Sequence, residues 1–443
     1  MNVILPIVFI LFTACASTPI KTTSQKVINV KDFGAKGDGI TNDYLSFKNA
    51  VEAINKQGGG KLEIPLGHYL LNTYSTGKED KSLVFQNCKQ LEIEGNNSIM
   101  ELKGDFHRKV TRTGAKHKFS TDRSLVPLLI QNCKDVRISN LVIDGNVDQM
   151  SRDASIVEAA GHLVMIRESR NVVLYNLELH HAMSDGLVLG GNNIPSMEIT
   201  IDRVISRNNG RQALTIGYAQ DVMIKNSEFS YTGITEGNYG HHAPAAGLDI
   251  EPNREFQKVK NITFENCTFK NNMGSEAVIN HISTTDGVVF KHCHFESSPD
   301  SSRKWEIIVN AKNVNFHDCT FVFPNGSIYP TWHKDGSSAG FYNCYIKSGD
   351  AGILAVSFNP NSTVIVDNCI LEYTGKEVIE RYFPYIRMPG LSFTNNVIKI
   401  PGDKIKGKRV DGLIEEVKLY KNNRIESSGN NKPRISTTNA KTK

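Results

Sequence analysis

Two acidic residues, Asp249 and Glu251, stand two residues apart in a short segment that has the composition of a β-strand. Because alternate residues of a strand face the same side, both carboxylates are expected on one face, about 6.6 Å apart along the strand. Carboxylates placed in this way can act as acid and base, orient a neighbouring histidine or hold Ca²⁺. This pair is the starting point for a candidate catalytic site.

Other residues that exchange protons or carry charge are expected close to this pair. Arg211 belongs to the preceding structural repeat of the chain, and His281 to the following one. We predict His281 level with Glu251, across one strand spacing of roughly 4.8 Å. An insert before the acidic strand supplies three more candidates, Tyr239, His241 and His242.

This set of residues fits β-elimination from a uronic acid. That reaction needs the substrate carboxylate neutralised, a base at the neighbouring carbon and an acid for the leaving oxygen. Arg211 could neutralise the carboxylate through a forked contact. A histidine of the insert, or His281, could take the proton, and Tyr239 could return one. The chemistry requires no cofactor and we assign no metal ligand, although Asp249 and Glu251 leave room for Ca²⁺.

A basic loop nearer the N-terminus favours an anionic ligand. Residues 103–123 hold seven basic and two acidic residues, on a chain whose net charge is only +5. Such a collar would attract an acidic glycan, although a solvated surface loop can have the same composition. From this loop and from two other turns we take the substrate-binding candidates Arg108, Lys109, Arg112, Lys116, Lys118, His180, His181, Asp185 and Trp305.

Two other classes of function remain open. In the first, Asp249 and Glu251 are the acid and base of an inverting glycoside hydrolase, with water between them. Met183-Ser184-Asp185-Gly186 resembles the Asn-Thr-Asp-Gly segment of polygalacturonases. However, Gly210-Arg211-Gln212 stands where their paired aspartates are expected, so we do not carry their catalytic residues across. In the second, the protein is a non-catalytic glycan-binding surface lipoprotein in which Trp305 and Trp332 stack on sugars.

A sequence repeat predicts the elements that position these residues. Alternating apolar residues followed by a cysteine recur about every 25 residues, with the cysteines at Cys267, Cys293, Cys319, Cys344 and Cys369. A helical repeat does not alternate in this way, so each repeat should form one coil of short strands stacked on its neighbours. The cysteines then form a buried ladder that serves packing rather than redox or metal chemistry.

Aligning the second strand of successive coils predicts which residues share a column on the outer face. One column is Val188, Thr215, Asp249, Ile279 and Ile308, and a second is Gly190, Gly217, Glu251, His281 and Asn310. A third, uniformly small, is Gly186, Ala213, Gly247 and Ala277, and it would let a sugar chain lie close against the sheet. The candidate site depends on this register.

The N-terminal segment points to the same architecture. Asp32-Phe33-Gly34-Ala35-Lys36-Gly37-Asp38-Gly39 is rich in turn residues, and Phe47 to Ile54 has apolar residues at helical spacing before the stop Gly58-Gly59-Gly60. A helix here would cap the open end of the stack. This segment and the repeats, together residues 27–400, closely resemble the pectate-lyase-like superfamily of right-handed parallel β-helices.

The resemblance implies an all-β, single-domain right-handed parallel β-helix of about eleven or more coils with an N-terminal capping helix. The superfamily includes lyases, hydrolases, epimerases and phage tailspikes, so it defines function weakly. The chain is also similar to β-helix proteins of marine polysaccharide-degrading bacteria, which include polysaccharide lyases and an ulvan-oligosaccharide dehydratase. We therefore predict a carbon–oxygen lyase that acts on uronic-acid-containing oligo- or polysaccharide, sulfated or not, and forms an unsaturated uronyl product.

Residues 1–15 are an apolar segment too short to span a bilayer, and they end in Leu11-Phe12-Thr13-Ala14-Cys15. This end is similar to the lipobox of bacterial lipoproteins, which implies export, lipidation of Cys15 and an anchor in the outer membrane, on the periplasmic side or the cell surface. A plain secretory signal is the alternative.

Behind this segment we expect a linker at 16–26, the β-helix at 27–401, a C-terminal cap at 402–426 and a disordered tail at 427–443. The chain has 51 basic and 46 acidic residues, a balance that gives no indication of a nucleic-acid partner. Composition does not define the oligomeric state.

Overall fold

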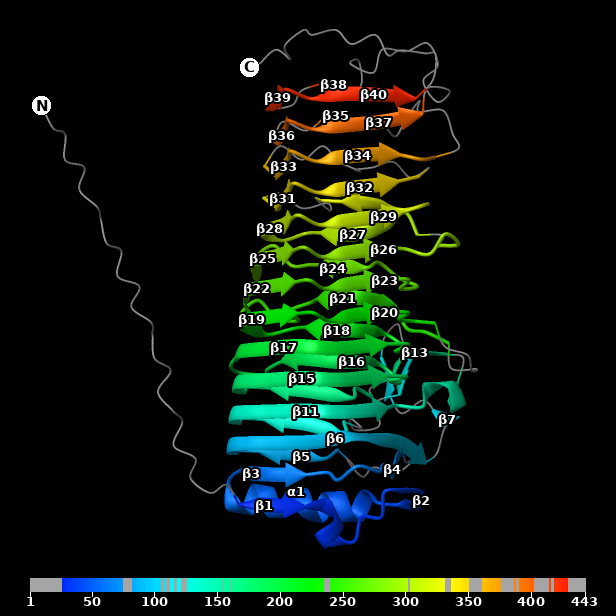
Figure 1. Ribbon diagram of the computed structural model, residues 1–443, viewed down its shortest axis with the longest axis vertical. Coiled ribbons are helices and arrows are strands. Elements are labelled where there is room, and N and C mark those ends of the chain that lie inside the picture. The colour runs from blue at the N-terminus through cyan, green and yellow to red at the C-terminus, as the bar shows by residue number, and fades with distance from the viewer. Residues whose placement is uncertain are drawn as a thin grey trace, which may run out of the picture.

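Stacked β-coils form the body of the protein in the computed structural model (Figure 1). The structure describes residues 26–74, 82–104, 107–108, 112–114, 118–120, 126–153, 155–159, 161–234, 240–301, 303–330, 336–349, 361–375, 386–387, 390–401, 414–415 and 418–428. Over these ranges, no helix is both long and apolar enough to cross a bilayer.

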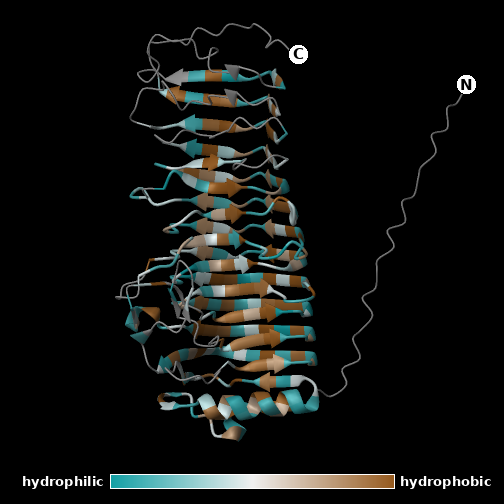
Figure 2. Cartoon of the chain, turned by 180° about the vertical axis from the view of Figure 1, so that it is seen from behind, coloured by the Kyte–Doolittle hydropathy of each residue, from teal (hydrophilic) through white to brown (hydrophobic). Residues whose placement is uncertain are grey.

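A helix closes the N-terminal end of the stack. β1 (Val27–Asn29), the 3-10 helix η1 (Val30–Phe33) and β2 (Asp38–Asn42) lead into α1 (Tyr44–Gln57). α1 lies across the end of the first coils (Figures 1 and 2) and buries Phe47, Ala50, Val51 and Ile54, the stripe seen in the sequence. It ends at Gly58, whose φ of 77° favours glycine. The prediction of a capping helix is confirmed.

Two parallel sheets run along the coils. The smaller has nine described strands, one above the next: β5 (Val84–Gln86), β10 (Leu128–Gln131), β14 (Val164–Arg167), β16 (Asp185–Gly190), β18 (Gln212–Ile216), β21 (Ala246–Ile250), β24 (Ala277–Ile279), β27 (Trp305–Val309) and β30 (Ser327–Tyr329). The larger begins with β1 and β2, followed by β3 (Gly60–Glu63), β4 (His68–Tyr74), β6 (Lys89–Gly104), β11 (Lys134–Asp144), β15 (Arg170–His180) and β17 (Ser196–Arg207). A 3-10 turn, η2 (Val147–Gln149), follows β11.

After β17 each coil gives the larger sheet two short strands instead of one long one. These are β19 (Ala219–Lys225), β20 (Glu228–Ser230), β22 (Val259–Glu265), β23 (Thr268–Lys270), β25 (Thr285–Lys291), β26 (His294–Glu296), β28 (Lys312–His317), β29 (Thr320–Phe323), β31 (Ser338–Tyr342), β32 (Tyr345–Ser348), β33 (Thr363–Asp367), β34 (Ile370–Tyr373), β36 (Leu391–Thr394), β37 (Val397–Pro401), β39 (Leu419–Lys421) and β40 (Arg424–Ser428). Short strands outside these two sheets are β7 (His107–Arg108), β8 (Arg112–Thr113), β9 (Lys118–Ser120), β12 (Ser151–Arg152), β13 (Ile156–Ala159), β35 (Ile386–Arg387) and β38 (Ile414–Glu415).

Like residues of successive coils stack in the core. The rings of Phe264 and Phe290, and of Phe290 and Phe316, are parallel with centroids 4.7 Å apart. The five cysteines of the repeat are buried free thiols, in agreement with a packing role. At the turn before each cysteine, residues such as Asn343 and Asn368 adopt left-handed φ angles of 57° and 55°, which asparagine tolerates well. The Asn368 amide donates to Oδ1 of Asn343 at 2.9 Å, so the turns are also linked from coil to coil.

Removing one ring of this stack should destabilise the fold strongly. Phe290→Ala is expected to lower the free energy of unfolding by about 3–5 kcal/mol, because the ring is fully buried and packs between two others. Thermal and denaturant unfolding followed by circular dichroism would measure the loss. Ile205→Ala, at a residue 40 % exposed, is the control and should change stability by less than about 0.5 kcal/mol. Similar midpoints for both variants would contradict the assigned core.

The ladder continues beyond the C-terminal boundary that the sequence predicted. β39 pairs with β36 and β40 pairs with β37, so residues 419–428, mostly within the segment expected to be a cap, include stacked strands. The repeat is less visible in the sequence of the last coils because Asn396 and Asn423 take the place of cysteine there. Their amides donate to the carbonyls of Val366 and Phe393 at 2.9 and 2.7 Å.

Two carboxyl groups are fully buried on neighbouring coils, at Glu276 and Glu306. Burial raises the pKa of Glu306 to about 7 and that of Glu276 well above its ordinary value. Between the unfolded and folded pKa values the folded chain binds more protons than the unfolded chain. The contribution of Glu306 to stability should therefore fall as the pH rises from about 4.5 to about 7 and stay lower above that window.

Glu306→Gln should remove part of this pH dependence. We expect the variant to be more stable than the wild type at about pH 8, by at most about 3 kcal/mol, with the gain vanishing near pH 4.5. Unfolding midpoints measured at both pH values provide the test, and Glu255→Gln at an exposed residue is the control. A gain that is equal at the two pH values would show that ionisation of Glu306 is not its cause.

Candidate functional site

Polar side chains gather on the outer face of the smaller sheet, over β16, β18 and β21. Val188 pairs with Thr215 and Thr215 with Asp249, as predicted for this column. Asp249 is almost completely buried, whereas the side chain of Glu251, two residues further along, is 37 % exposed. The two carboxylates therefore lie close in the chain but in very different surroundings.

The register differs from the prediction at the next coil. Asp249 pairs with Val278 rather than with Ile279. The N–H of Asn280 donates to the carbonyl of Ile250, so Asn280, not His281, stands level with Glu251.

His281 lies one residue further, in a turn with φ 72°, where its carbonyl accepts the N–H groups of Thr284 and Thr285 at 2.9 and 2.8 Å. The predicted contact between Glu251 and His281 is therefore wrong. β24 has only three residues, too few for alternation to define which of them face inward.

The column of small residues also differs from the prediction. Glu276 follows Gly247 in this column, since Leu248 pairs with Ala277. A Cβ on Gly186 would lie 2.1 Å from Oγ of Ser206, and one on Gly247 would lie 2.5 Å from the Asn272 amide. Because those groups are buried, the column faces the interior and gives no outer surface for a sugar chain.

Asp185 is the centre of the polar network. It lies at the start of β16 and is 1 % exposed. Oδ2 is 2.9 Å from the hydroxyl of Thr215, 3.4 Å from Nη1 of Arg211 and 3.4 Å from Nδ1 of His162. Burial alone would raise the pKa of Asp185, but the positive charge of Arg211, the imidazole of His162 nearby and the hydrogen bond from Thr215 lower it to about 2. Asp185 is therefore ionised at neutral pH.

Arg211 connects Asp185 to the acidic strand. Its guanidinium lies 3.4 Å from the Asp185 carboxylate and 3.5 Å from Oε2 of Glu251. Both separations are long for ion pairs, and the side chain is 16 % exposed. Arg211 therefore holds positive charge at the junction of β16, β18 and β21.

The pKa of Asp249 is shifted in the opposite direction to that of Asp185. Burial, followed by the negative charge of Glu251, raises the pKa of Asp249 to about 8. Oδ2 accepts a hydrogen bond from the amide of Gln212, while Oδ1 has no hydrogen-bond partner in the described part of the chain. Asp249 is therefore a protonated acid at neutral pH, beside an ionised aspartate one coil away. Carboxyl groups with pKa values driven apart are typical of acid–base sites.

Residues 235–239 of the insert, Tyr239 among them, lie outside the described residues. His242 is 1 % exposed, and its N–H donates to the carbonyl of Gly210, next to Arg211. His241 is half-buried. Of this pair, His241 is the more exposed, and the catalytic roles of both residues stay predictions.

The other predicted residues are distributed more widely. Lys109 and Lys116 lie outside the described residues, as do the side chains of Arg108 and Arg112, while Lys118 is exposed on β9. Trp305 is half-buried on β27 and stacks on Tyr329 with a centroid distance of 4.8 Å. The substrate-binding roles of these residues stay predictions.

His180 and His181, at the end of β15, are not part of the Asp185 network. Both contact Asp144, the last residue of β11, and His181 also contacts Asp148. The substrate contacts predicted for His180 and His181 stay predictions, and this cluster is considered separately below.

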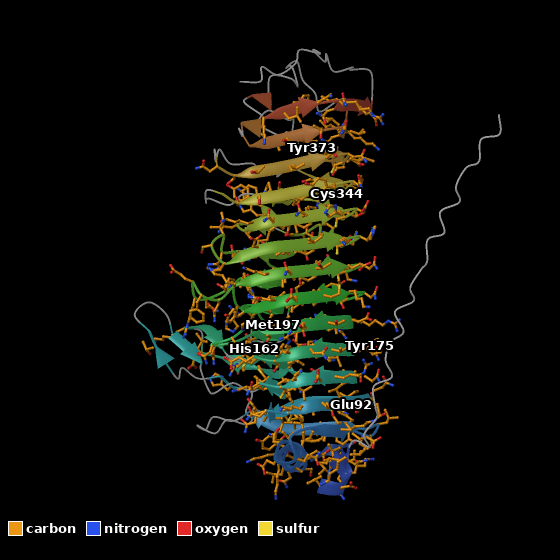
Figure 3. All side chains as sticks on the ribbon, turned by 90° about the vertical axis from the view of Figure 1, so that its left-hand side faces the viewer. Glu92, His162, Tyr175, Met197, Cys344 and Tyr373 are labelled. Atoms are coloured by element: carbon orange, nitrogen blue, oxygen red, sulfur yellow. The ribbon has the colours of Figure 1, made fainter. Side chains whose placement is uncertain are left out.

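His162 and Gln212 are functional candidates that the sequence analysis missed. His162 precedes β14 and lies in the N-terminal half of the stack (Figure 3). The strand alignment could have identified His162 if it had been extended by one coil. Val164 pairs with Leu187, and His162 and Asp185 each lie two residues before these partners. Gln212 pairs with Asp185 in the ladder, and its amide connects Thr215 with Asp249.

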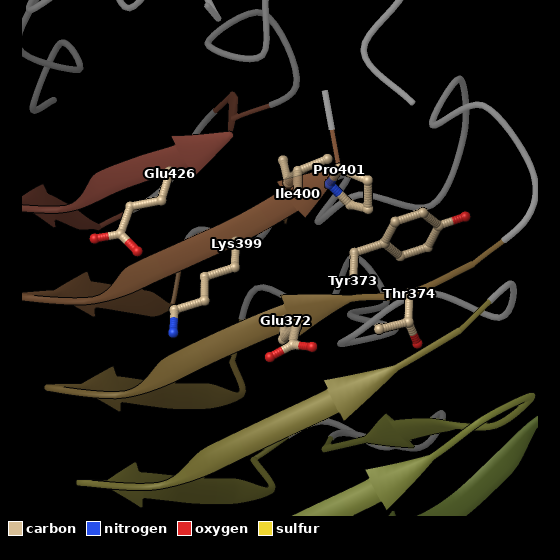
Figure 4. A pocket seen from close by; sticks show the side chains of 7 residues that line it. All are labelled: Glu372, Tyr373, Thr374, Lys399, Ile400, Pro401 and Glu426. Atoms are coloured by element: carbon tan, nitrogen blue, oxygen red, sulfur yellow. The ribbon is translucent and has the colours of Figure 1, made fainter. Parts of the chain in front are cut away.

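A surface hollow near the C-terminal end of the stack is separate from the site around Asp185 and Asp249. It has a volume of about 460 Å³ and lies over β34, β37 and β40 (Figure 4). Its lining is Glu372, Tyr373, Thr374, Lys399, Ile400, Pro401 and Glu426. The side chains of the two glutamates in this lining are 28 % and 46 % exposed, so neither resembles the buried acid at Asp249.

Comparison with known proteins identifies the class of fold. Residues 127–321 match the family described as the right handed beta helix region. A surface adhesin of Streptococcus pneumoniae, PfbA, has a similar structure, with a TM-score of 0.54 and 15 % identity over 90 % of both chains. The chain is therefore a right-handed parallel β-helix, as the sequence predicted. At this identity the likeness shows the fold alone.

Two curated relatives act on glycans, according to their names. A capsule KN3-specific depolymerase of Klebsiella phage KN3-1 is 23 % identical over 89 % of this chain and 48 % of its own length. Alginate lyase 7 of Azotobacter vinelandii is 30 % identical over 27 % of this chain and 13 % of its own length. The chain thus spans less than half of the length of either relative.

Proposed function

We propose that the protein is a lyase that acts by β-elimination on oligo- or polysaccharides containing uronic acid, through either chain scission or loss of water. The observation that carries this proposal is the environment of Asp249. Its carboxyl group is buried, is protonated at neutral pH and has an oxygen, Oδ1, without a partner among the described residues. An anionic substrate that binds over this site therefore meets a neutral carboxyl group instead of a repelling charge.

The carboxylate of the sugar would bind between Asp249 and Arg211. A base removes the proton from the carbon next to the carboxylate, the electron pair forms the double bond, and the bond to the leaving oxygen breaks. Negative charge develops on the carboxylate oxygens during this step. The proton of Asp249 and the positive charge of Arg211 stabilise it there, which lowers the barrier.

We assign the role of the base to His162. The carboxylate of Asp185 lies 3.4 Å from Nδ1 of His162, so its negative charge stabilises the positive charge that the imidazole gains on accepting a proton. With an exposed fraction of 18 %, the ring is accessible from the outer face. The leaving oxygen needs an acid, and Tyr239 remains our proposal for that role.

A second candidate function rests on the pair Asp249 and Glu251. A protonated acid and a more exposed carboxylate two residues away could act as acid and base of an inverting glycoside hydrolase. The names of the relatives include both a depolymerase and a lyase, so they support action on a glycan without choosing between the two reactions. A non-catalytic glycan-binding protein is the third candidate.

One assay separates these functions. Purified protein is incubated with uronate-containing glycans, and ultraviolet absorbance is followed for the conjugated double bond of an unsaturated uronyl product. Absorbance with chain scission supports a polysaccharide lyase, and absorbance with loss of one water and no scission supports a dehydratase. New reducing ends without absorbance would establish the hydrolase and overturn our proposal. Glycan binding with neither signal would establish the binding protein.

We also propose that the protein works outside the cytoplasm, held in the outer membrane by a lipid on Cys15. The support is the lipobox-like end of residues 1–15, which lie outside the described residues. Metabolic labelling with a fatty-acid analogue tests this, since labelling should disappear in Cys15→Ser. Equal labelling of both chains would contradict it.

A further inference from the structure

A cluster of two histidines and two aspartates lies where β11 and β15 end. Asp144 and His180 are partners in the parallel ladder, so the fold places them side by side. His181 follows directly with φ 55°, and this left-handed turn directs its ring back towards the other two residues. Asp148, in the turn η2, completes the cluster.

Three donor atoms converge in this cluster. Nδ1 of His180 lies 2.8 Å from Nδ1 of His181, and the two nitrogens lie 3.5 and 3.4 Å from Oδ1 of Asp144. These separations are close to the edges of a metal coordination polyhedron. A point about 2.1 Å from all three atoms lies roughly 0.9 Å outside their plane, which leaves a fourth position open.

The surroundings of His181 have the second feature of a metal site. Its other ring nitrogen, Nε2, lies 3.3 Å from Oδ2 of Asp148. A histidine that binds a metal commonly donates its second N–H to a carboxylate, which holds the ring and its tautomer in place. The two aspartates also offset the charge that a divalent ion would bring. Their side chains, with those of the histidines, are 12–25 % exposed, so an ion could enter from solvent.

We infer that Asp144, His180 and His181 bind one divalent transition-metal ion of the zinc class, with Asp148 as the partner that orients His181. Two imidazole nitrogens and one carboxylate favour such an ion over Ca²⁺ or Mg²⁺, which prefer oxygen ligands. The ion would join the coils of β11 and β15 just before the chain enters β16. This inference is independent of the proposed reaction, because none of these residues belongs to the Asp185 network.

The test measures metal binding directly, on the full chain without a histidine tag. After treatment with a chelator, the protein is titrated with Zn²⁺ by calorimetry and with Co²⁺ by visible absorption, at about pH 7.5 so that the imidazoles can bind. We expect one ion per chain, a rise in the thermal midpoint with Zn²⁺, and a d–d absorption band with Co²⁺. Ca²⁺ should produce none of these changes.

Isosteric variants then assign the ligands. Asp144→Asn and His180→Gln should abolish binding, and His181→Asn should do the same while keeping a residue that tolerates the left-handed turn. Asp148→Asn should weaken binding by about 10–100-fold, as expected for an orienting partner. His294→Asn is the matched control, because His294 also pairs with a carboxylate, at 3.0 Å from Glu296, but lies outside the cluster.

The chelator-treated variants should have thermal midpoints near that of the chelator-treated wild type, which separates lost binding from lost folding. The inference is overturned if the wild type binds no Zn²⁺ or Co²⁺ at micromolar concentration. It is equally overturned if folded His181→Asn binds as the wild type does, or if the loss in His294→Asn is as large as the loss in His181→Asn.

Discussion

The rate of β-elimination should fall steeply as the pH rises through about 8, the pKa of Asp249. The proposed site uses Asp249 in its protonated form, so each further pH unit should lower kcat/KM about tenfold. Below that pH the group is already protonated, and its contribution should be constant. Asp249→Asn should remove this alkaline limb, because an amide remains a neutral hydrogen-bond donor at all of these pH values.

The size of the remaining activity distinguishes the two reactions. For a lyase, the amide introduced by Asp249→Asn would still bind the sugar carboxylate, and we expect kcat/KM to fall by about 10–100-fold at neutral pH. For a hydrolase the same variant would lose at least about 10³-fold, since an amide cannot protonate a leaving group. Circular dichroism over the same pH range controls for unfolding. An unchanged alkaline limb in Asp249→Asn would rule out Asp249 as its origin.

His162→Gln should have the largest effect of any single imidazole replacement in the site. If His162 removes the proton, its loss should lower kcat by about 10²–10⁴-fold with a much smaller change in KM. Asp185→Asn should also lower kcat, since it removes the negative charge that stabilises the imidazolium form. Initial rates measured by ultraviolet absorbance at several substrate concentrations separate kcat from KM.

His281→Asn is the matched control for this prediction. The sequence alone made His281 a catalytic candidate, but the register places Asn280 beside Glu251. Asparagine tolerates the φ of 72° at this position, so the variant should fold, and its rate should stay within about twofold of the wild type. A large loss in His281→Asn together with full activity in His162→Gln would exchange the two assignments and disprove ours.

Much of the architecture was predictable because it depends on local and repeated features. The alternation around Phe264, Phe290 and Phe316 defines strands that bury the same side in each coil, and their rings stack as expected. The turn residues before the cysteines and the apolar stripe of α1 act over a few residues only. Such patterns remain visible in the sequence, because every coil must satisfy the same backbone and packing requirements.

The site was predictable only in part. Asp249, Glu251, Arg211 and Asp185 were identified from their residue types and from the strand pattern. The contacts between these residues could not be predicted, because each contact depends on the register between neighbouring coils. A shift of one residue moved His281 away from Glu251, and the long segments between coils hid the relation of His162 to Asp185.

By itself the sequence determined that this chain forms a capped stack of parallel β-coils, and that acidic and basic side chains gather near its second strand. Only the tertiary structure decided that Asp249 is protonated, that Asp185 is ionised and that His162 stands beside it. The physical reason is that a structural repeat depends on the pattern of residue types within each short stretch of the chain. A pKa, by contrast, depends on burial and on charges contributed by residues that lie tens of positions apart and meet only after folding.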